Sequence, residues 1–141
     1  MGYRYIEGLT VADVAFEATG KDFSELCESA AKAVTNAMIE NPSSIKEKES
    51  KLVVVSADDE EKLLHELLDE IIFLKDAENM AFNSFSAKLE KKDKLILTVE
   101  MKGEEIDQKK HNIIVDVKAV SWHKYEVKKN GEWKAVVILD V

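Results

Sequence analysis

The amino-acid sequence predicts an α+β fold with largely antiparallel sheet structure, two main amphipathic helices and a C-terminal β-hairpin. Three observations lead to this prediction. Two segments place apolar residues at helical spacing, and most other segments show the alternation or the β-branched content of strands. The dipeptide Asn130-Gly131 separates the last two strand segments. Because helices interrupt the strands only twice, a doubly wound parallel sheet is not expected.

Length and composition predict a single domain spanning residues 1–141. The chain is 45% hydrophobic and 34% charged, which is typical of a globular protein. Its net charge of −8 at pH 7 disfavours non-specific binding to nucleic-acid phosphates. The lone Cys27 cannot form an intramolecular disulfide, and no apolar run approaches the roughly 20 residues that span a bilayer. These features predict a cytoplasmic protein that does not contact a membrane.

Two segments have the pattern of amphipathic helices. The segment 21–40 has apolar side chains at alternating spacings of three and four residues, a possible capping box at Asp22 and Glu25, and a stop signal at Asn41-Pro42. The segment 58–74 has a leucine-rich stripe, and acidic residues load its first turn. Cys27 lies on the apolar face of the first helix, so we expect it to be a core residue.

The remaining segments read as strands. Alternation in 13–19 places Val14, Phe16 and Ala18 on one face, and Gly20 ends this strand. The polar stretch 103–110 is expected to be a solvated loop. Further strands are expected from their β-branched and aromatic content at 51–56, 82–89, 94–101, 125–129 and 132–139, with 82–89 and 94–101 paired to each other.

The Asn130-Gly131 dipeptide predicts a tight type I′ turn. A two-residue loop places Lys129 opposite Glu132, and that register carries along the hairpin. Ser121 is then opposite Asp140.

The same register defines a candidate site at the C-terminal end. His123 is expected opposite Ile138, diagonal to the Asp140 carboxylate. The side chain of Asp140 and the terminal carboxylate of Val141 bring two anionic groups together, and Asp13 could add a third from another strand. Such an oxygen cluster is typical of a site for a hard cation.

Three aromatic residues lie close together near this end of the chain. Alternation places Trp122 on the face opposite His123 and Tyr125. This placement favours cross-strand packing over the stacking of a nucleic-acid base.

Familiar enzyme motifs are absent from the sequence. It contains no GxGxxG, GxxxxGK[ST], GxSxG, HExxH or CxxC motif. One alternative is a stand-alone, metal-dependent enzyme of the phosphoesterase kind that uses Asp13, His111, His123 and Asp140. Another is a chaperone-like or scaffolding module whose negative charge attracts basic clients.

A set of C-terminal motifs resembles the archease family, whose chains end in a GE…D…H…VKAVTYH…VxFDI pattern. The order of Ala12-Asp13-Val14, an amphipathic helix and the leucine-rich helix 63–74 is also similar to that family, so the resemblance covers nearly the whole chain. The matching C-terminal motifs are Gly103-Glu104-Glu105-Ile106-Asp107, His111, Val117-Lys118-Ala119-Val120-Ser121-Trp122-His123 and Val136-Val137-Ile138-Leu139-Asp140-Val141.

The resemblance implies a role that is not itself enzymatic. Archeases are small cytosolic proteins that assist the GTP-dependent RNA ligase of the RtcB type, which joins tRNA exon halves. The implied activity is to promote guanylylation of the ligase's active-site histidine and to restore its turnover. The implied partner is therefore the ligase, with tRNA associated indirectly and no independent binding of nucleic acid.

The resemblance also implies a divalent metal ion with oxygen ligands, of the calcium kind. The family's ligands correspond here to Asp13, Asp140 and Val141, and the supporting residues would be Glu104, His111 and His123. The family's N-terminal motif is altered, because Leu9, Thr10 and Val11 stand where the family has Asp, His and Thr. Glu7 could restore an acid only if the strand bulges. This departure bears on metal affinity rather than on the fold.

Overall fold

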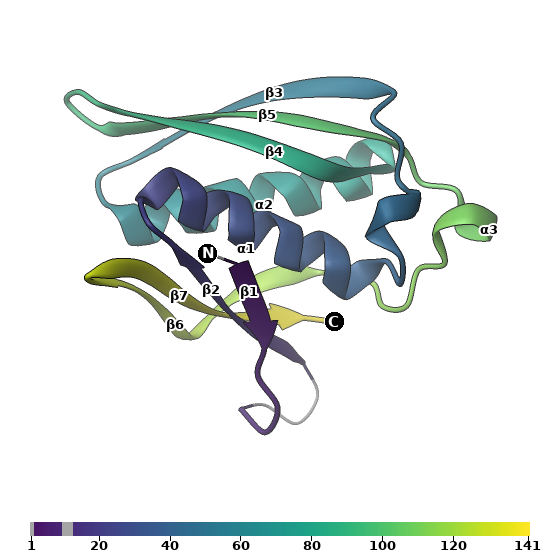
Figure 1. The fold of residues 1–141 in the computed structure, drawn as a ribbon, viewed down its shortest axis with the longest axis horizontal. Helices are drawn as coiled ribbons and strands as arrows, with labels where there is room; N and C mark the ends of the chain where they lie inside the picture. Colours follow the sequence, from purple (N-terminus) through teal and green to yellow (C-terminus); the bar gives the residue numbers. More distant parts are fainter. Residues whose placement is uncertain (1, 10–12) are drawn as a thin grey trace.

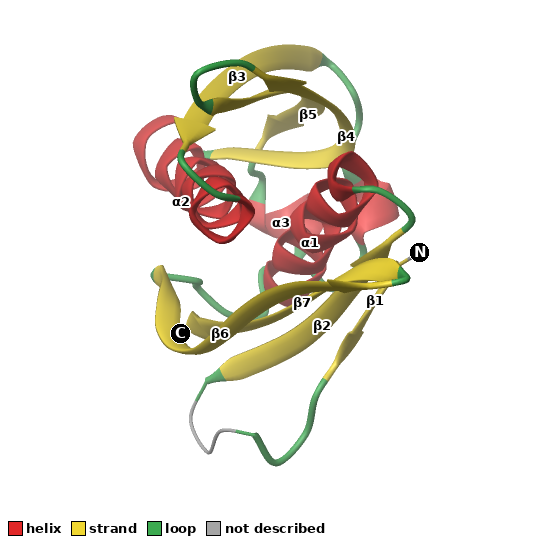
Figure 2. Ribbon diagram, turned by 90° about the vertical axis from the view of Figure 1, so that its left-hand side faces the viewer, coloured by secondary structure: helices red, strands yellow, loops and turns green. Residues whose placement is uncertain are grey.

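The protein consists of two antiparallel sheets with two helices packed between them. The computed structural model describes residues 2–9 and 13–141. In Figures 1 and 2 the layers follow the order sheet, helices, sheet, and the termini lie at the lower sheet. Buried apolar side chains from both sheets and both helices form one core cluster. The predicted α+β class is confirmed.

Each sheet contains strands from distant parts of the sequence. The first sheet has the order β1-β2-β7-β6, and the second has the order β3-β5-β4. All pairings are antiparallel, including the expected pairing of β4 with β5. The strands are β1 (Gly2–Tyr5), β2 (Val14–Gly20), β3 (Glu49–Ala57), β4 (Met80–Lys91), β5 (Leu95–Glu105), β6 (Ala119–Asn130) and β7 (Glu132–Asp140).

The first helix, α1, spans Phe23–Met38 and confirms the sequence-based prediction. At its N-terminus the side chain of Asp22 accepts a hydrogen bond from the Glu25 N–H at 2.8 Å. The Glu25 carboxylate in turn accepts one from the Lys21 N–H at 3.1 Å. These bonds satisfy amide donors that a helix start leaves free. The buried Cys27 faces the core, as expected.

The second helix, α2, spans Glu60–Glu78 and extends four residues beyond the predicted end. Its N-cap is Asp59, which accepts a hydrogen bond from the Lys62 N–H at 2.8 Å. The helix ends at Asn79, which adopts a left-handed conformation with φ of 54°. Asparagine tolerates this conformation better than most residues do, so it ends the helix without a glycine.

Three short elements were not expected from the sequence. They are β1, the 3₁₀ helix η1 (Pro42–Ser44) and the short helix α3 (Gln108–His111). The stretch 103–110, expected to be a loop, instead completes β5 and begins α3. Within the described ranges, no helix combines the length and the apolar character needed to cross a lipid bilayer.

The C-terminal hairpin is present, but its predicted turn type and register are wrong. Gly131 has a positive φ of 82° and Asn130 does not, whereas a type I′ turn requires positive φ at both central residues. Asn130 pairs with Glu132 and Lys129 with Trp133, so the ladder is offset by one residue from the expected pairing. The expected partner of Lys129 was Glu132, and the error propagates along both strands.

A bulge in β6 displaces the register further. Ser121 pairs with Ile138 and Glu126 with Val136, so residues 122–125 of β6 face the single residue Val137 of β7. Within the bulge, Lys124 has a positive φ of 55°. Extra residues of this kind bend a strand and redirect its side chains.

Candidate functional site

Asp13 and Asp140 lie at the same end of the first sheet. β2 pairs with β7 so that Val14 lies opposite Leu139. Asp13 precedes Val14 and Asp140 follows Leu139, so both lie beyond the same end of this ladder. The register therefore brings two half-buried aspartates from opposite ends of the sequence to one end of the sheet.

The backbone around Asp140 is held on both sides. Asp140 pairs with Ala119 of β6, and its carbonyl oxygen accepts a hydrogen bond from the Lys118 N–H at 2.8 Å. Val141 is half-buried and packs against the core cluster. These contacts hold the backbone of Asp140 and Val141 at the end of the sheet.

The chemistry of this acidic end fits a hard divalent cation. Its donors are oxygens, from Asp13, Asp140 and Val141, and such donors suit calcium or magnesium rather than a metal that prefers thiolates. Among residues 2–9 and 13–141, no group of three or more His, Cys, Asp or Glu residues is arranged to hold a metal ion. A cation here would therefore rely on the Val141 carboxylate, backbone carbonyls or water in addition to the two aspartates.

His123 does not occupy the position that the sequence predicted. The residue opposite Ile138 is Ser121, the residue opposite Asp140 is Ala119, and His123 lies in the exposed β6 bulge. Its backbone N–H donates a hydrogen bond to the Ser121 Oγ at 3.0 Å. The expected diagonal between His123 and Asp140 is wrong because the prediction assumed a ladder without a bulge.

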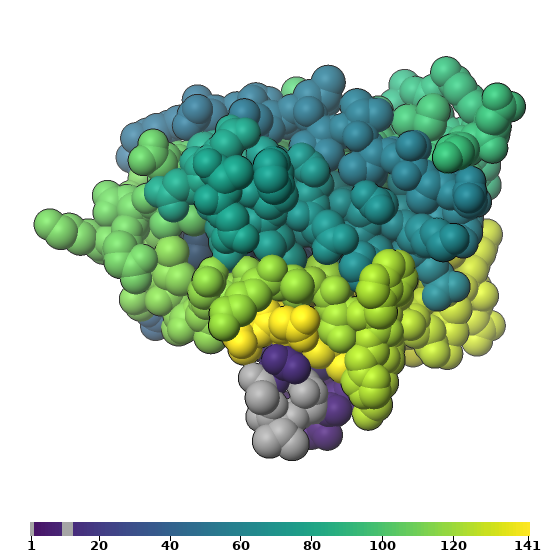
Figure 3. All heavy atoms as spheres, turned by 180° about the vertical axis from the view of Figure 1, so that it is seen from behind, coloured from purple at the N-terminus to yellow at the C-terminus, as the bar shows by residue number. Residues whose placement is uncertain are grey.

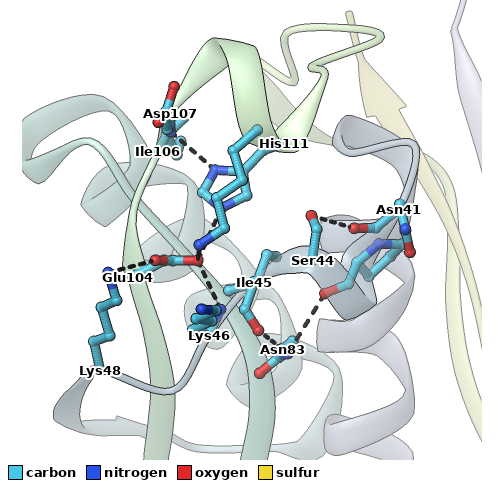
Figure 4. A network of polar contacts seen from close by, with 12 residues as sticks. Asn41, Ser44, Ile45, Lys46, Lys48, Asn83, Glu104, Ile106, Asp107 and His111 are labelled. Atoms are coloured by element: carbon cyan, nitrogen blue, oxygen red, sulfur yellow. Dashed lines mark hydrogen bonds and ion pairs between the residues drawn. The ribbon is translucent and has the colours of Figure 1, made fainter.

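Glu104 and His111 form a separate buried network at the end of β5 (Figure 4). The Oε2 atom of Glu104 accepts hydrogen bonds from the His111 Nε2 at 3.0 Å, the Lys110 Nζ at 2.6 Å and the Lys46 N–H at 2.7 Å. The Lys48 Nζ lies 3.6 Å from the other carboxylate oxygen. One carboxylate thus joins α3, the segment before β3 and the end of β5.

Both ring nitrogens of His111 have protein partners. The Asp107 N–H donates to Nδ1 at 2.9 Å, which makes Nδ1 the acceptor and leaves Nε2 to donate to Glu104. The His111 side chain is completely buried. Neither nitrogen is therefore free to bind a metal ion or to accept a substrate proton in this arrangement.

The network lowers the pKa of Glu104 to about 2. The largest cause is the hydrogen bond from Lys110, followed by the one from the Lys46 N–H. Burial opposes these effects by disfavouring the charged form, and the bond from His111 lowers the pKa further. Glu104 is therefore held as a carboxylate, and its charge stabilises the surrounding donors.

Gly103 is required by the close approach of β4. A Cβ atom at this position would lie 1.9 Å from the carbonyl oxygen of Ala81 and 2.7 Å from the Cα of Phe82. These are backbone atoms of β4, beside the bulge between Phe82 and Ser84, and backbone cannot move aside as a flexible side chain can. The glycine before Glu104 thus lets the strands meet closely enough to position the carboxylate.

We expect Gly103→Ala to lower the free energy of unfolding by about 3 kcal/mol, because the added methyl group must push two strands apart. Chemical denaturation monitored by circular dichroism measures this change. Lys102→Ala is the matched control, since Lys102 is exposed and a surface substitution usually changes stability by less than about 0.5 kcal/mol. Equal stability of Gly103→Ala and the wild-type protein would contradict the close approach.

Sequence reasoning missed two groups of residues. The sequence-based prediction assigned no function to the lysines around Glu104. The closeness of Lys110 and His111 along the chain could have indicated that both bind one carboxylate. The second group is an aromatic cluster in which Trp122 stacks on His65, with ring centroids 3.7 Å apart. Trp122 also contacts Tyr125, with centroids 5.2 Å apart, so the prediction that these two residues lie on opposite faces is wrong.

One part of the candidate site lies outside the described residues. Of the three altered motif positions, Thr10 and Val11 fall in the gap between residues 9 and 13. Leu9 is half-buried, and Glu7 is exposed in a bend.

Comparison with known proteins identifies the family of this chain. Residues 3–141 match the Archease protein family (MTH1598/TM1083). An archease from Methanothermobacter thermautotrophicus is 36% identical, and the match covers 99% of both chains. An archease from Pyrococcus furiosus is 32% identical over 92% of this chain and 93% of that protein.

Solved structures agree with this result. The solution structure of protein 1598 from Methanobacterium thermoautotrophicum superposes with a TM-score of 0.82 at 33% identity, covering 99% of both chains. The crystal structure of an archease from Thermotoga maritima, described as a possible chaperone, shares the fold with a TM-score of 0.57 at 20% identity, covering 94% of this chain and 93% of that one. The match over nearly the entire length, together with the agreement in fold, shows that this chain belongs to the archease family.

Proposed function

We propose that this protein activates an RtcB-type RNA ligase in tRNA splicing, by promoting guanylylation of the ligase histidine and its multiple turnover. The observation that carries the proposal is the placement of Asp13 and Asp140 at the same end of the β2–β7 ladder, in a chain of the archease family. The protein would work in the cytoplasm and reach tRNA only through the ligase.

The acidic end would hold a divalent metal ion through Asp13, Asp140 and the Val141 carboxylate. When bound, such an ion offsets negative charge on phosphate oxygens. The contribution of this chain is to position the donors: the β2–β7 ladder aligns the two aspartates, and the Lys118 N–H holds the Asp140 backbone. This arrangement supplies carboxylates to a nucleotide site that another protein provides.

The geometry of the two histidines favours a helper over a stand-alone phosphoesterase. His111 is completely buried and both its ring nitrogens are bonded, so it is not available as a general base. His123 lies in the β6 bulge rather than beside Asp140. The set of Asp13, His111, His123 and Asp140 required by the enzyme alternative is thus not assembled as one group in the described part of the chain.

A reconstituted ligation reaction tests the proposal. The ligase is incubated with GTP, a divalent metal and tRNA exon halves, with and without this protein, and both multiple-turnover ligation and histidine guanylylation are measured. We expect both rates to rise when the protein is present. No increase, with a folded protein and a ligase that is active alone, would overturn the proposal.

A second assay distinguishes the proposed activator from the alternative of a stand-alone phosphoesterase. The isolated protein is incubated with divalent metals and a panel of phosphoesters, since an enzyme must turn over without a partner. We expect no turnover above that of the Asp140→Ala variant. Metal-dependent hydrolysis that Asp140→Ala abolishes would favour the enzyme instead.

A further inference from the structure

The aromatic cluster on α2 and β6 presents an indole ring to solvent. The side chain of Trp122 is 60% exposed. One face of its ring lies parallel to the His65 imidazole, at an interplanar angle of 3°, and Tyr125 packs edge-on against both rings. The other tryptophan, Trp133, is half-buried and packs edge-on against Phe23, so Trp122 is the more exposed of the two.

The indole is held in place from below. The Asp69 carboxylate accepts a hydrogen bond from the His65 Nδ1–H at 3.0 Å, because an ionised carboxylate has no proton to donate. The Tyr125 hydroxyl donates to the Glu61 carbonyl at 2.6 Å. The His65 Nε2 is buried and has no hydrogen-bond partner among the described residues. A buried nitrogen without a hydrogen-bond partner costs stability. The stacking of the His65 ring on Trp122 gives a reason for this residue to be present, which is to support the indole.

The β6 bulge directs Trp122 toward α2. Residues 122–125 leave the ladder, Lys124 adopts a positive φ, and the His123 N–H donates to the Ser121 Oγ. Bulges at sheet edges commonly redirect a side chain for a function, and β6 is one of the two edge strands of its sheet. An aromatic ring that is already fixed loses little entropy when a partner binds it.

The surroundings of the indole are strongly acidic. Residues 58–70 of the chain contain seven acidic side chains and one lysine. Glu61, His65 and Asp69 are spaced four residues apart, so they form a line on one side of α2. Asp69 bonds to His65 and the Glu61 carbonyl accepts from Tyr125, so both acidic residues belong to elements in contact with the cluster. Burial is the largest cause that raises the pKa of the Tyr125 hydroxyl, followed by Cys27 and then by the carboxylates of Glu61, Asp59 and Asp69. Lys124 in the bulge adds one positive charge.

We infer that Trp122, Glu61 and Asp69 form a docking surface for an arginine side chain of a protein partner. A guanidinium stacks on the free face of an indole by a cation–π contact and pairs with carboxylates at the ring edge. The same acidic residues repel phosphates, so a stacked RNA base is disfavoured. Tryptophan and arginine are also the residues that most often dominate binding energy at interfaces.

The position of this surface suits the proposed function. Trp122 lies three residues along β6 from Ala119, the ladder partner of Asp140, which corresponds to about 10 Å of strand. Figure 3 shows the yellow-green residues of β6 against the blue-green surface of α2, with the yellow C-terminal residues beside them. One partner can therefore contact the indole and the acidic end together. That this partner is the RtcB-type ligase rests on the proposed function.

A peptide-binding experiment tests the surface without the ligase. A fluorescently labelled peptide with three arginines separated by glycines is titrated with the protein and followed by anisotropy, and the unlabelled peptide is followed by the indole N–H resonances. We expect binding that shifts the Trp122 indole resonance, with about tenfold weaker affinity for Trp122→Ala and an intermediate loss for Trp122→Phe. A lysine peptide of equal length should bind more weakly than the arginine peptide.

Matched variants control for exposure and charge. Leu52→Ala removes an exposed apolar side chain from the other sheet, and Asp93→Asn removes an exposed charge from the β4–β5 turn. We expect both to bind like the wild-type protein, whereas Asp69→Asn should bind more weakly. Equal losses of peptide affinity for Trp122→Ala and Leu52→Ala would contradict the proposal that Trp122 forms a docking surface. If a ten-nucleotide single-stranded RNA binds in a way that depends on Trp122, the assignment of an arginine side chain as the ligand of this surface is contradicted.

The ligase assay connects this surface to the proposed function. If both hold, Trp122→Ala raises the concentration of protein needed for half-maximal stimulation but leaves the plateau unchanged. Failure of the wild-type protein to stimulate the ligase would contradict the proposed function alone, because the peptide titration still decides whether the surface binds arginine. Stimulation by Trp122→Ala at the wild-type half-maximal concentration would contradict the assignment of the ligase as the partner of this surface.

Discussion

Asp140→Ala is expected to reduce stimulation of an RtcB-type ligase at least tenfold while the fold stays intact. The substitution removes one of the two aspartates at the end of the β2–β7 ladder, and with it a donor to the proposed divalent metal. The backbone contacts of residue 140, its pairing with Ala119 and its bond from the Lys118 N–H do not need the side chain. Multiple-turnover ligation at saturating protein measures the effect.

Two further measurements make this prediction specific. Asp13→Asn should have a similar effect, because Asp13 lies beyond the same end of the β2–β7 ladder, whereas Asp93→Asn at the β4–β5 turn should have none. Calorimetric titration with Ca²⁺ or Mg²⁺ should show weaker binding to both site variants than to the wild-type protein. If Asp140→Ala stimulates the ligase fully and its thermal unfolding is unchanged, the acidic end is not required for the activity, which contradicts the prediction.

Glu104→Ala is expected to lower the free energy of unfolding by about 3 kcal/mol. The substitution leaves the buried His111 Nε2–H and the Lys46 N–H without their acceptor, and it removes the carboxylate that pairs with Lys110. Leaving buried donors unpaired costs more than the net value of the bonds themselves. Urea denaturation at pH 7 measures the change, and Glu105→Ala is the matched control because Glu105 is exposed.

The same carboxylate predicts a pH dependence. Its pKa is about 2 in the folded protein, lower than the ordinary value of 4.5 that we take for the unfolded chain. A lowered folded-state pKa contributes stability that is fully present above the unfolded value and is lost as the pH falls toward the folded value. Between pH 4.5 and 2, Glu104→Gln should therefore lose less stability than the wild-type protein does. Parallel stability curves for the two proteins over this range would contradict the network.

The helices were predictable because their signals are local. The apolar spacing of α1, its cap at Asp22 and the stop after residue 40 lie within one short segment. The end of α2 was missed because Asn79, rather than a glycine or a proline, ends it. The strand β1 was missed for a different reason: four residues carry too little pattern, and what holds them is pairing with β2 and the bond from the Tyr5 hydroxyl to the Ala33 carbonyl.

The candidate site was only partly accessible from the sequence. The family resemblance pointed to Asp13, Asp140, Glu104 and His111. It did not show that the two aspartates lie at the end of the first sheet while Glu104 and His111 lie in a separate buried network. Glu104 receives the Lys46 N–H from a segment 58 residues away, and that contact exists only because β5 lies beside β3. The predicted position of His123 was wrong because it assumed regular alternation along β6, and the bulge in β6 interrupts that alternation.

By itself, the sequence determined the α+β class, the two amphipathic helices, the C-terminal hairpin and the acidic character of the chain. Periodicity, capping and charge depend on neighbouring residues, so they can be recognised without a fold. Only the tertiary structure decided the division into two sheets, the burial of Glu104 with His111, and the stacking of Trp122 on His65. These features depend on pairings between residues far apart in the chain, where a single extra residue in one strand changes which side chains meet.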